Sequence, residues 1–392
     1  MRAGLILLCL AYVLSQFFRA FLAVLAKVLE ADIGTDPEAL AQASGLWFLS
    51  FAAMQIPVGW ALDKIGPRRT ASVLLLIGGA GGAVIFAMAT SAMHINIAML
   101  LIGVGCSPVL MASYYIFARQ FPPAQFATLA ALMLGVGSIG NLVASYPMAF
   151  AAETLGWRAS LYALAALSGV VALGIAAFVR DPEPAQTDVK GSVLDLLKMP
   201  ALWAIFPIML VNYMPVAGIR GLWIGPYLSD IYGATTAQVG TASLIMGIAM
   251  IVGTLCYGPL DRIFGTQKWV VFAGNLACAA VIGALVLFVD SGMILAIALC
   301  AAIGFFGMTF PVIIAHARGF IPAHLAGRGV TLMNLFGIGG VGLMQFASGR
   351  FHTQITATHG IETAYGALFA LFGGLLVIGL VAYLFSRDAA RA

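Results

Sequence analysis

Long apolar stretches separated by short polar breaks recur along the whole chain of 392 residues. Twelve of them approach or exceed the roughly 20 apolar residues that an α-helix needs to cross a bilayer. They lie at 4–26, 42–62, 70–90, 95–117, 126–150, 158–179, 201–226, 237–259, 269–289, 292–315, 328–348 and 364–386. The pattern therefore predicts an all-α membrane protein with twelve transmembrane helices.

Composition supports a lipid environment for most of this surface. Hydrophobic residues make up 62% of the chain and charged residues 9%, whereas soluble domains carry about 25% charged residues. The first stretch is too long for the apolar region of a signal peptide and has no small-residue cleavage site, so we interpret it as a retained helix. The net charge of +4 gives no reason to expect a nucleic-acid partner.

The distribution of basic residues predicts the orientation of the helices. With twelve spans, fourteen Lys and Arg residues fall on the side of the two termini, and three (Lys27, Arg158 and Arg350) fall on the other side. Because basic loops stay in the cytoplasm, we expect both termini to be cytoplasmic. The size and the short loops favour a bacterial inner membrane.

Two similar halves are indicated by the longest polar break, which contains three prolines at positions 181–200. We interpret it as a cytoplasmic linker between six-helix bundles at 1–180 and 201–392. The segment Ala118–Ala124 matches Ala317–Ala323 at five of seven positions. Because six helices restore the orientation of the chain, the halves form a parallel repeat, a known transporter plan with the substrate site at the repeat interface.

The break after the second stretch contains a charged motif. It reads Gly59-Trp-Ala-Leu-Asp63-Lys64-Ile-Gly66-Pro-Arg68-Arg69. This motif resembles the cytoplasmic signature of the major facilitator superfamily, and a looser copy with Asp261 and Arg262 follows the eighth stretch. We expect both copies to control the conformational balance through contacts of their acids with basic residues or helix N-termini. The alternative is an ordinary charged turn.

The resemblance also implies which helices bind the solute. In this superfamily the first, fourth, seventh and tenth helices line a central cavity that opens alternately to either side. The arginine that many members carry in the fourth helix is absent from residues 99–105. That departure leaves the mode of coupling open.

Two arginines interrupt apolar stretches, Arg19 in the first and Arg220 in the seventh. A charge at the bilayer centre costs about 2.5–3.5 kcal/mol on insertion scales and normally faces a bundle interior. Each arginine has a tyrosine seven residues earlier, on the same helical face. We therefore predict a substrate-binding set consisting of Arg19, Tyr12, Gln16, Arg220, Tyr213 and Asn212.

The charge of these arginines points to an anionic solute. No Asp or Glu lies in the middle of a predicted span, so a carboxylate, phosphate or oxyanion of the substrate is the expected counter-ion. The alternative is that one or both arginines extend to the outer membrane interface or bind backbone carbonyls. All five histidines are expected near helix ends or in loops, which disfavours a proton relay. Anion exchange, uniport and coupling through a protonated substrate remain open.

Other functions than anion transport are compatible with the sequence. A multidrug or metabolite efflux permease is the main alternative, and Met246 and Met250 at helical spacing allow a copper importer as a minor one. No metal-ligand cluster, nucleophile motif or phosphate loop supports an enzyme, and we expect no cofactor or metal. The expected partners are a small anionic solute and the bilayer, and we expect a monomer.

Overall fold

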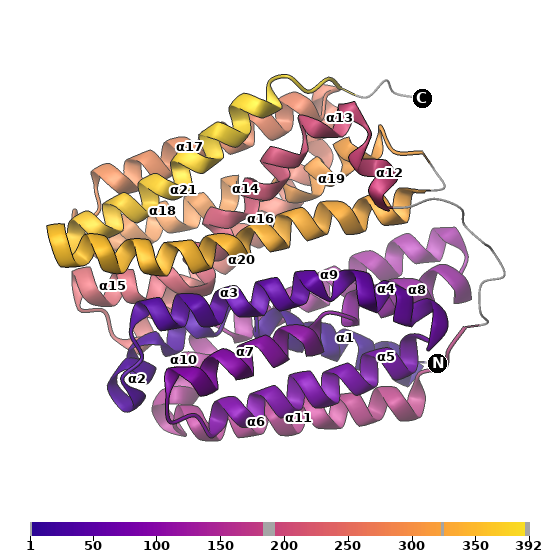
Figure 1. Cartoon of the computed structure of the whole chain (residues 1–392), viewed down its shortest axis with the longest axis horizontal. Coiled ribbons are helices and arrows are strands. Elements are labelled where there is room, and N and C mark those ends of the chain that lie inside the picture. The colour runs from indigo at the N-terminus through magenta and orange to yellow at the C-terminus, as the bar shows by residue number, and fades with distance from the viewer. Residues whose placement is uncertain (1, 183–192, 323–324, 389–392) are drawn as a thin grey trace. The chain divides into compact units, whose positions relative to one another are not determined.

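The computed structural model describes residues 2–182, 193–322 and 325–388, and every described element is a helix (Figure 1). The first group consists of α1 (Arg2–Phe17), α2 (Leu22–Ile33), α3 (Pro37–Ala53), α4 (Gln55–Lys64), α5 (Pro67–Leu74), the π-helix η1 (Leu75–Ala80), α6 (Gly81–Ala87), α7 (Ala92–Cys106), α8 (Val109–Gln120), α9 (Pro123–Val143), α10 (Tyr146–Thr154) and α11 (Trp157–Phe178).

The second group begins after the linker region. It consists of α12 (Val193–Leu197), α13 (Pro200–Trp203), α14 (Phe206–Gly218), the π-helix η2 (Ile219–Trp223), α15 (Ile224–Tyr232), α16 (Thr236–Phe264), α17 (Lys268–Leu287), α18 (Met293–Phe306), α19 (Phe310–Arg318), α20 (Ala326–His359) and α21 (Ile361–Tyr383).

The predicted fold class is confirmed. In the described part of the chain, nine helices or continuous helix runs are long and apolar enough to cross a membrane, and three bent pairs raise the number to as many as twelve. The bends are 54° between α1 and α2, 40° between α3 and α4, and 41° between α9 and α10. The continuous helices predicted at 4–26, 42–62 and 126–150 are therefore each broken in two.

Proline accounts for two of the breaks. Pro57 and Pro147 lie within the first three residues of α4 and α10, where a missing N–H interrupts no intrahelical hydrogen bond. The break between α1 and α2 has no proline. There the rings of Phe17, Phe18 and Phe21 pack on one another with centroids 5.6–5.8 Å apart, which stabilises a bend that no local sequence signal predicts.

The chain divides into two compact units. Unit 1 is Met1–Thr187 with Thr236–Gly240, and unit 2 is Asp188–Thr235 with Thr241–Ala392. The predicted linker 181–200 falls where unit 1 gives way to unit 2, but its residues 183–192 lie outside the described part. Its boundaries therefore stay a prediction.

Glycines allow close helix packing inside each unit. A methyl group on Gly140 of α9 would overlap the carbonyl oxygen of Val13 in α1, and one on Gly340 of α20 would overlap the carbonyl oxygen of Leu210 in α14. Helices α1 and α14 therefore each contact a glycine-bearing partner helix directly through the backbone.

The eleventh span is longer than predicted. The apolar pattern gave 328–348, whereas α20 continues to His359. Gln345, Ser348 and His352 interrupt the pattern, yet they share one helical face and are buried inside unit 2. The expectation that every histidine lies near a helix end or in a loop is wrong for His352, because its hydrophobic surroundings come from other helices.

Candidate functional site

Arg19 lies in the break between α1 and α2. The backbone here makes a helical hydrogen bond from Phe18 N to Leu14 O (2.9 Å), four residues back. The next one, from Ala20 N to Phe17 O (3.0 Å), reaches only three residues back and closes a tighter turn. The side chain consequently leaves from a bend rather than from a regular helix. The predicted alignment of Tyr12 and Arg19 along one straight face does not apply across this bend.

Two aromatic rings of α3 hold the guanidinium of Arg19. Its Cζ atom is 5.3 Å from the ring centroid of Trp47 and 5.6 Å from that of Phe51. These two rings stack on each other, with centroids 5.2 Å apart and planes at 19°. Such cation–π contacts orient a guanidinium but do not use its N–H groups.

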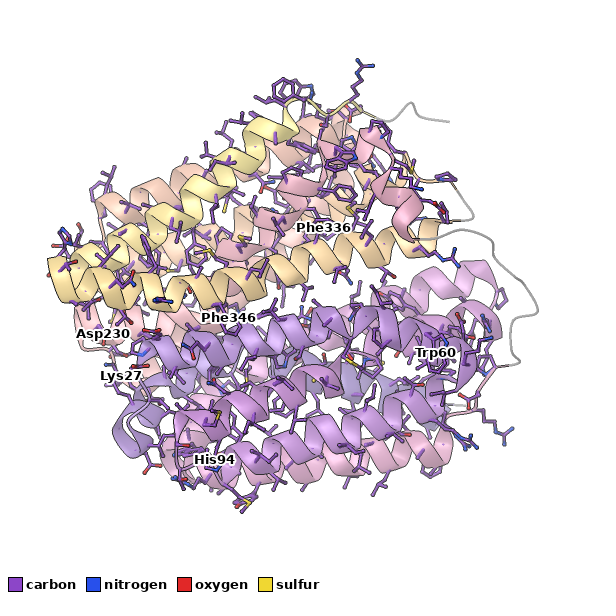
Figure 2. The ribbon with its side chains drawn as sticks, in the orientation of Figure 1. Lys27, Trp60, His94, Asp230, Phe336 and Phe346 are labelled. Atoms are coloured by element: carbon purple, nitrogen blue, oxygen red, sulfur yellow. The ribbon has the colours of Figure 1, made fainter. Side chains whose placement is uncertain are left out.

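Buried donors next to each other lack acceptors at this position. Arg19 Nε and Trp47 Nε1 are both buried, and neither has a hydrogen-bond partner within the described residues. Lys27, labelled in Figure 2, differs because its ammonium group contacts Glu30 at 2.7 Å. Unsatisfied buried N–H groups are costly, so the geometry favours an acceptor brought by a ligand.

Tyr12 and Gln16 form a second polar contact in α1. Gln16 Nε2 donates a hydrogen bond to the hydroxyl oxygen of Tyr12 (2.8 Å), while Gln16 Oε1 is buried without a partner in the described residues. The Tyr12 ring lies against Gly137 of α9, where any side chain would overlap it. Tyr12 is thus fixed by packing, and the amide of Gln16 retains an unused acceptor.

Arg220 occupies a different environment in unit 2. It lies in η2, five residues after Pro215 of α14, and is 3% exposed. Pro215 cannot donate to the helical ladder, and the glycines around Arg220 favour a wider turn. The guanidinium lies against Gly247 of α16, where an added methyl would be 2.9 Å from Nη2. The guanidinium fits here because residue 247 is a glycine and has no side chain.

Asn212 is held by a fully buried polar cluster. Its amide nitrogen donates to Asn275 Oδ1 (2.7 Å) and to Thr309 Oγ1 (2.9 Å), and Asn275 Nδ2 also donates to Thr309 Oγ1 (2.9 Å). These contacts join α14 to α17 and to the break before α19. Tyr213, one residue on, faces Phe310 with ring centroids 5.5 Å apart. Asn212 therefore belongs to the polar cluster, whereas the side chain of Tyr213 contacts an aromatic ring.

The first charged motif contacts the end of α11. Gly66 has a φ of +98°, and a methyl group there would lie 2.8 Å from the carboxyl carbon of Asp181. Asp181 Oδ1 accepts the backbone N–H of Arg68 at 2.7 Å, at the start of α5. Asp63 lies 3.8 Å from Arg119 in the same unit. Arg69 is exposed, and a methyl at Gly59 would meet nothing within 4 Å.

The second motif repeats the contact with the end of its own unit. Asp388 Oδ1 accepts the backbone N–H groups of Lys268 (2.8 Å) and Gln267 (3.1 Å) at the start of α17. Asp261 accepts a long hydrogen bond from Gln267 Nε2 (3.4 Å), and Arg262 is exposed. Partial burial alone would raise the pKa of Asp388, but bonds from Thr266, Lys268 and Gln267 outweigh it and lower the pKa.

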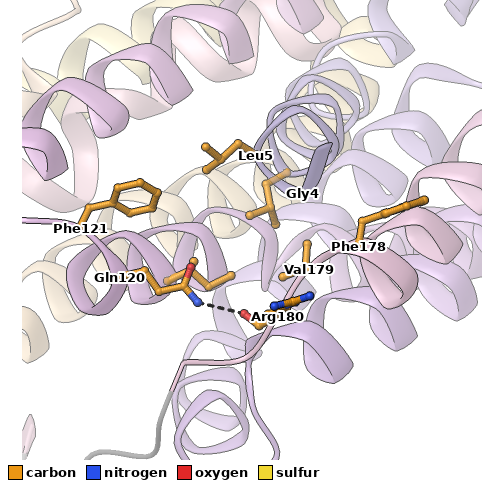
Figure 3. Close-up of a pocket in the computed structure, with 9 residues that line it drawn as sticks. Gly4, Leu5, Gln120, Phe121, Phe178, Val179 and Arg180 are labelled. Carbon is orange, nitrogen blue, oxygen red and sulfur yellow. Dashed lines mark hydrogen bonds between the residues drawn. The ribbon is translucent and has the colours of Figure 1, made fainter. Parts of the chain in front are cut away.

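Both capping acids were missed by the sequence analysis, although a signal existed. Phe178-Val-Arg-Asp181 begins at the last residue of α11 in unit 1, and Phe385-Ser-Arg-Asp388 follows α21, the last helix of unit 2. Next to Asp181, a cavity of about 400 Å³ opens among mostly apolar residues (Figure 3). In it Gln120 Nε2 donates to the carbonyl of Arg180 (3.2 Å).

Comparison with known proteins gives consistent results. The family described as the Major Facilitator Superfamily matches residues 8–341. The chain is 24% identical to a probable sulfoacetate transporter of Cupriavidus necator over 276 residues, 66% of this chain and 64% of that protein. It is 22% identical to a sialic acid transporter of Escherichia coli, over 94% of this chain and 91% of that one.

A solved structure has the same fold. The crystal structure of a D-xylose–proton symporter superposes with a TM-score of 0.77 and 16% sequence identity, covering 99% of this chain and 98% of that one. At this identity the likeness concerns the fold alone.

Proposed function

The chain belongs to the Major Facilitator Superfamily of small-solute transporters, and we propose that its solute is a small organic anion bearing a carboxylate or a sulfonate. Arg19 is its primary binding residue. Transport proceeds by alternating access across a bacterial inner membrane, with both termini in the cytoplasm.

One observation carries this proposal: the adjacent, buried and unpartnered N–H groups of Arg19 and Trp47. A neutral hydroxyl could accept one of these bonds, but it would leave the guanidinium without a counter-charge. An anion satisfies both donors and neutralises the cation, and such charge-assisted bonds are about twice as strong as neutral ones. The aromatic rings on one side leave the guanidinium fork free for bidentate contact.

The chemistry of the relatives' solutes agrees with this class. Sulfoacetate carries a sulfonate and a carboxylate, and sialic acid carries a carboxylate. The two matches come from proteins of different named specificity, and what their solutes share is the anionic group. The anion, rather than the rest of the solute, is therefore what we transfer to this chain.

The other predicted residues receive separate roles in the proposal. Tyr12 and Gln16 shape the site around Arg19 in unit 1. In unit 2, Arg220 contributes a second positive charge, with Tyr213 beside it. Asn212 positions α14 through Asn275 and Thr309, because its amide hydrogens are already engaged.

The charged motifs set the rate and the conformational balance in this proposal. Their residues are Gly59, Asp63, Gly66, Arg68, Arg69, Asp261 and Arg262. The supporting contacts are the capping of α5 by Asp181 and of α17 by Asp388, which fix the helix starts next to each motif.

Ligand-dependent thermal stabilisation tests the proposal directly. Purified wild type, Arg19→Gln and the control Lys27→Gln are heated in detergent with sulfoacetate, sialic acid, D-xylose or a panel of drug-like cations. We expect one or both anions to stabilise wild type and Lys27→Gln but not Arg19→Gln. Proteoliposome uptake of the stabilising anion then demonstrates transport.

Stabilisation by a neutral or cationic compound, equal in wild type and Arg19→Gln, would contradict the anion proposal and favour an efflux permease. The positions of Met246 and Met250 do not favour the copper importer. The side chains of Met246 and Met250 pack against Gly304 of α18, where an added methyl would lie 3.1 Å and 3.2 Å from their Cγ atoms.

A further inference from the structure

The far end of α2 is fastened to α11 by one carboxylate. Asp32 is the second-last residue of α2. It accepts a hydrogen bond of 2.9 Å from Trp157 Nε1 and forms an ion pair with the guanidinium of Arg158. Both donors belong to the first turn of α11. Asp32 therefore joins two helices of unit 1 at the point where the first of them ends.

The partners of Asp32 are themselves held by the end of α6. Arg158 Nη2 donates to the carbonyl oxygen of Ala89, two residues after α6 (3.1 Å). The guanidinium of Arg158 also lies over the Trp157 ring, with Cζ 4.2 Å from the centroid. Trp157 meets the edge of Phe86 of α6, with ring centroids 6.1 Å apart. The end of α6 and the start of α11 thus form one frame that binds Asp32.

The start of α2 is attached to the same frame. Phe21, the residue before α2, packs on Phe86 with ring centroids 5.3 Å apart. Helix α2 has 12 residues, so it is ~18 Å long at 1.5 Å per residue. Contacts at Phe21 and at Asp32 therefore hold opposite ends of a short rod. Together they fix its direction, which is inclined by 54° to α1.

The bend between α1 and α2 is the segment that carries Arg19. Arg19 lies two residues before Phe21, and its guanidinium rests on the rings of Trp47 and Phe51 in α3. The buried residues of α2 itself are aliphatic, and apolar burial is not directional. The polar contacts of Asp32 are directional, so they specify the angle at which the chain leaves the bend.

The same contacts add little to the stability of the fold. The side chains of Asp32 and Arg158 are each 41% exposed, and exposed ion pairs contribute roughly 0–1 kcal/mol. A contact of this kind can be lost without unfolding the unit. Its loss frees one end of α2 and so changes the geometry of the bend.

We propose that Asp32 is a positioning residue of the anion site: by holding the end of α2 on Trp157 and Arg158, it sets the bend that presents Arg19 to the solute. The inference rests on the proposed function of Arg19. Asp32 itself does not touch the anion, and its effect on binding passes through the backbone of α2.

The binding test uses sulfoacetate and sialic acid with wild type, Asp32→Ala and the control Glu30→Gln. Glu30 is a matched control because it lies on the same helix and pairs with Lys27 inside α2 at 2.7 Å. We expect each anion that binds wild type to bind Asp32→Ala about 3- to 10-fold more weakly, and Glu30→Gln to bind like wild type. Equal affinities of wild type and Asp32→Ala would overturn the proposal.

A double variant separates positioning from a general structural effect. Because Asp32 acts through Arg19, Asp32→Ala should not weaken binding further when Arg19→Gln is already present. A loss by the same factor in both backgrounds would overturn the positioning role. If Asp32→Ala does not fold, Arg158→Gln takes its place, since it removes the ion pair at an exposed position and leaves the bond from Trp157. Unchanged affinity in Arg158→Gln would then overturn the proposal.

The direction of α2 is tested without any solute. Spin labels are attached at Ala31→Cys in α2 and at Met93→Cys near the start of α7, both exposed positions. Cys9 and Cys256, which are not buried, are replaced by Ser. We expect the distance distribution between the labels to broaden or shift in Asp32→Ala and to stay unchanged in Glu30→Gln.

The two tests fail separately. An unchanged distance distribution in Asp32→Ala would overturn the positioning role even if the anion proposal holds. If neither anion binds wild type, the proposed function fails, while the spin-label distances still decide whether Asp32 sets the direction of α2.

Discussion

Helix α1 of unit 1 and helix α14 of unit 2 contact their partner helices in the same way, yet the two units place their arginines differently. Gly140 lies against the carbonyl of Val13, and Gly340 lies against the carbonyl of Leu210. Measured from these contacts, Arg19 is six residues further along the chain, whereas Arg220 is ten residues further. The difference of four residues is about one helical turn, or ~6 Å along a regular helix.

The spacing in the sequence conceals this difference. Both arginines follow a tyrosine by seven residues, which suggests equivalent positions, but the packing contacts show that the pairs are offset. Arg19 is half-buried on aromatic rings in a bend, and Arg220 is buried inside a π-helix. A shared helical framework therefore carries two chemically distinct cations. Substitutions at the glycine contacts should affect both units alike, whereas substitutions of the two arginines should have different effects.

The largest effect is expected from the framework. Gly140→Ala and Gly340→Ala each place a methyl on a carbonyl oxygen, so we expect each to lose about 2–3 kcal/mol of stability. The yield of monodisperse protein in size-exclusion chromatography should fall sharply for both. Gly135→Ala in α9 and Gly366→Ala in α21 are controls, because a methyl there meets nothing within 4 Å. Tolerance of one substitution but not the other would show that the two contacts are not equivalent.

Arg19→Gln should affect binding far more than stability. Loss of a charged hydrogen-bonding partner weakens anion affinity by ~10- to 100-fold. The thermal midpoint without solute should stay the same or rise, because an uncompensated cation is removed. Scintillation proximity binding and differential scanning fluorimetry measure the two effects. A large drop in the midpoint would instead assign Arg19 a structural role.

Arg220→Gln should reverse that order of effects. The buried guanidinium fills space against α16, so its truncation lowers the thermal midpoint and leaves a cavity. Anion affinity should fall by a smaller factor than in Arg19→Gln, about 3- to 10-fold. If both arginine variants gave the same ratio of binding loss to stability loss, the distinction between the two sites would be wrong.

The smallest effect is expected at the helix starts. Asp388→Asn removes a charged cap from α17 and should cost about 1 kcal/mol at pH 7. Since the pKa of Asp388 is lowered in the fold, its stabilisation is present above the unfolded pKa of about 3.9 and is lost as the pH falls through the lower, folded pKa. The thermal midpoints of wild type and Asp388→Asn should therefore converge at acidic pH. A difference that persists unchanged to pH 3 would contradict this.

The number and approximate position of the spans could be predicted because an apolar run of sufficient length has few other solutions. The bend at Phe18–Phe21 could not be predicted, since each of these residues is compatible with a helix and packing between side chains sets the angle. Arg19 and Arg220 were found because a cation in an apolar run is visible. Trp47 could not be assigned to Arg19, because the two meet only when α3 packs beside the bend.

His352 was missed for the opposite reason. The predicted run ended at Ser348, although Gln345, Ser348 and His352 are all buried and His352 is covered by the rings of Trp223 and Tyr365 from other helices. A hydropathy average counts the chemistry of the helix itself and not the surface that covers it. When a membrane helix has a buried polar face, a hydropathy average therefore places the end of the helix too early.

The π-helix η2 also changes the phase of the seventh span. A π-helical turn contains one more residue than an α-helical turn, so every side chain after Trp223 is rotated by about 100° from where a regular helical wheel would place it. Tyr227 and Asp230 owe their direction to this extra residue. In related chains, a one-residue gap in an alignment at 219–223 should accordingly be interpreted as gain or loss of the π turn, with a reoriented aromatic cluster behind it.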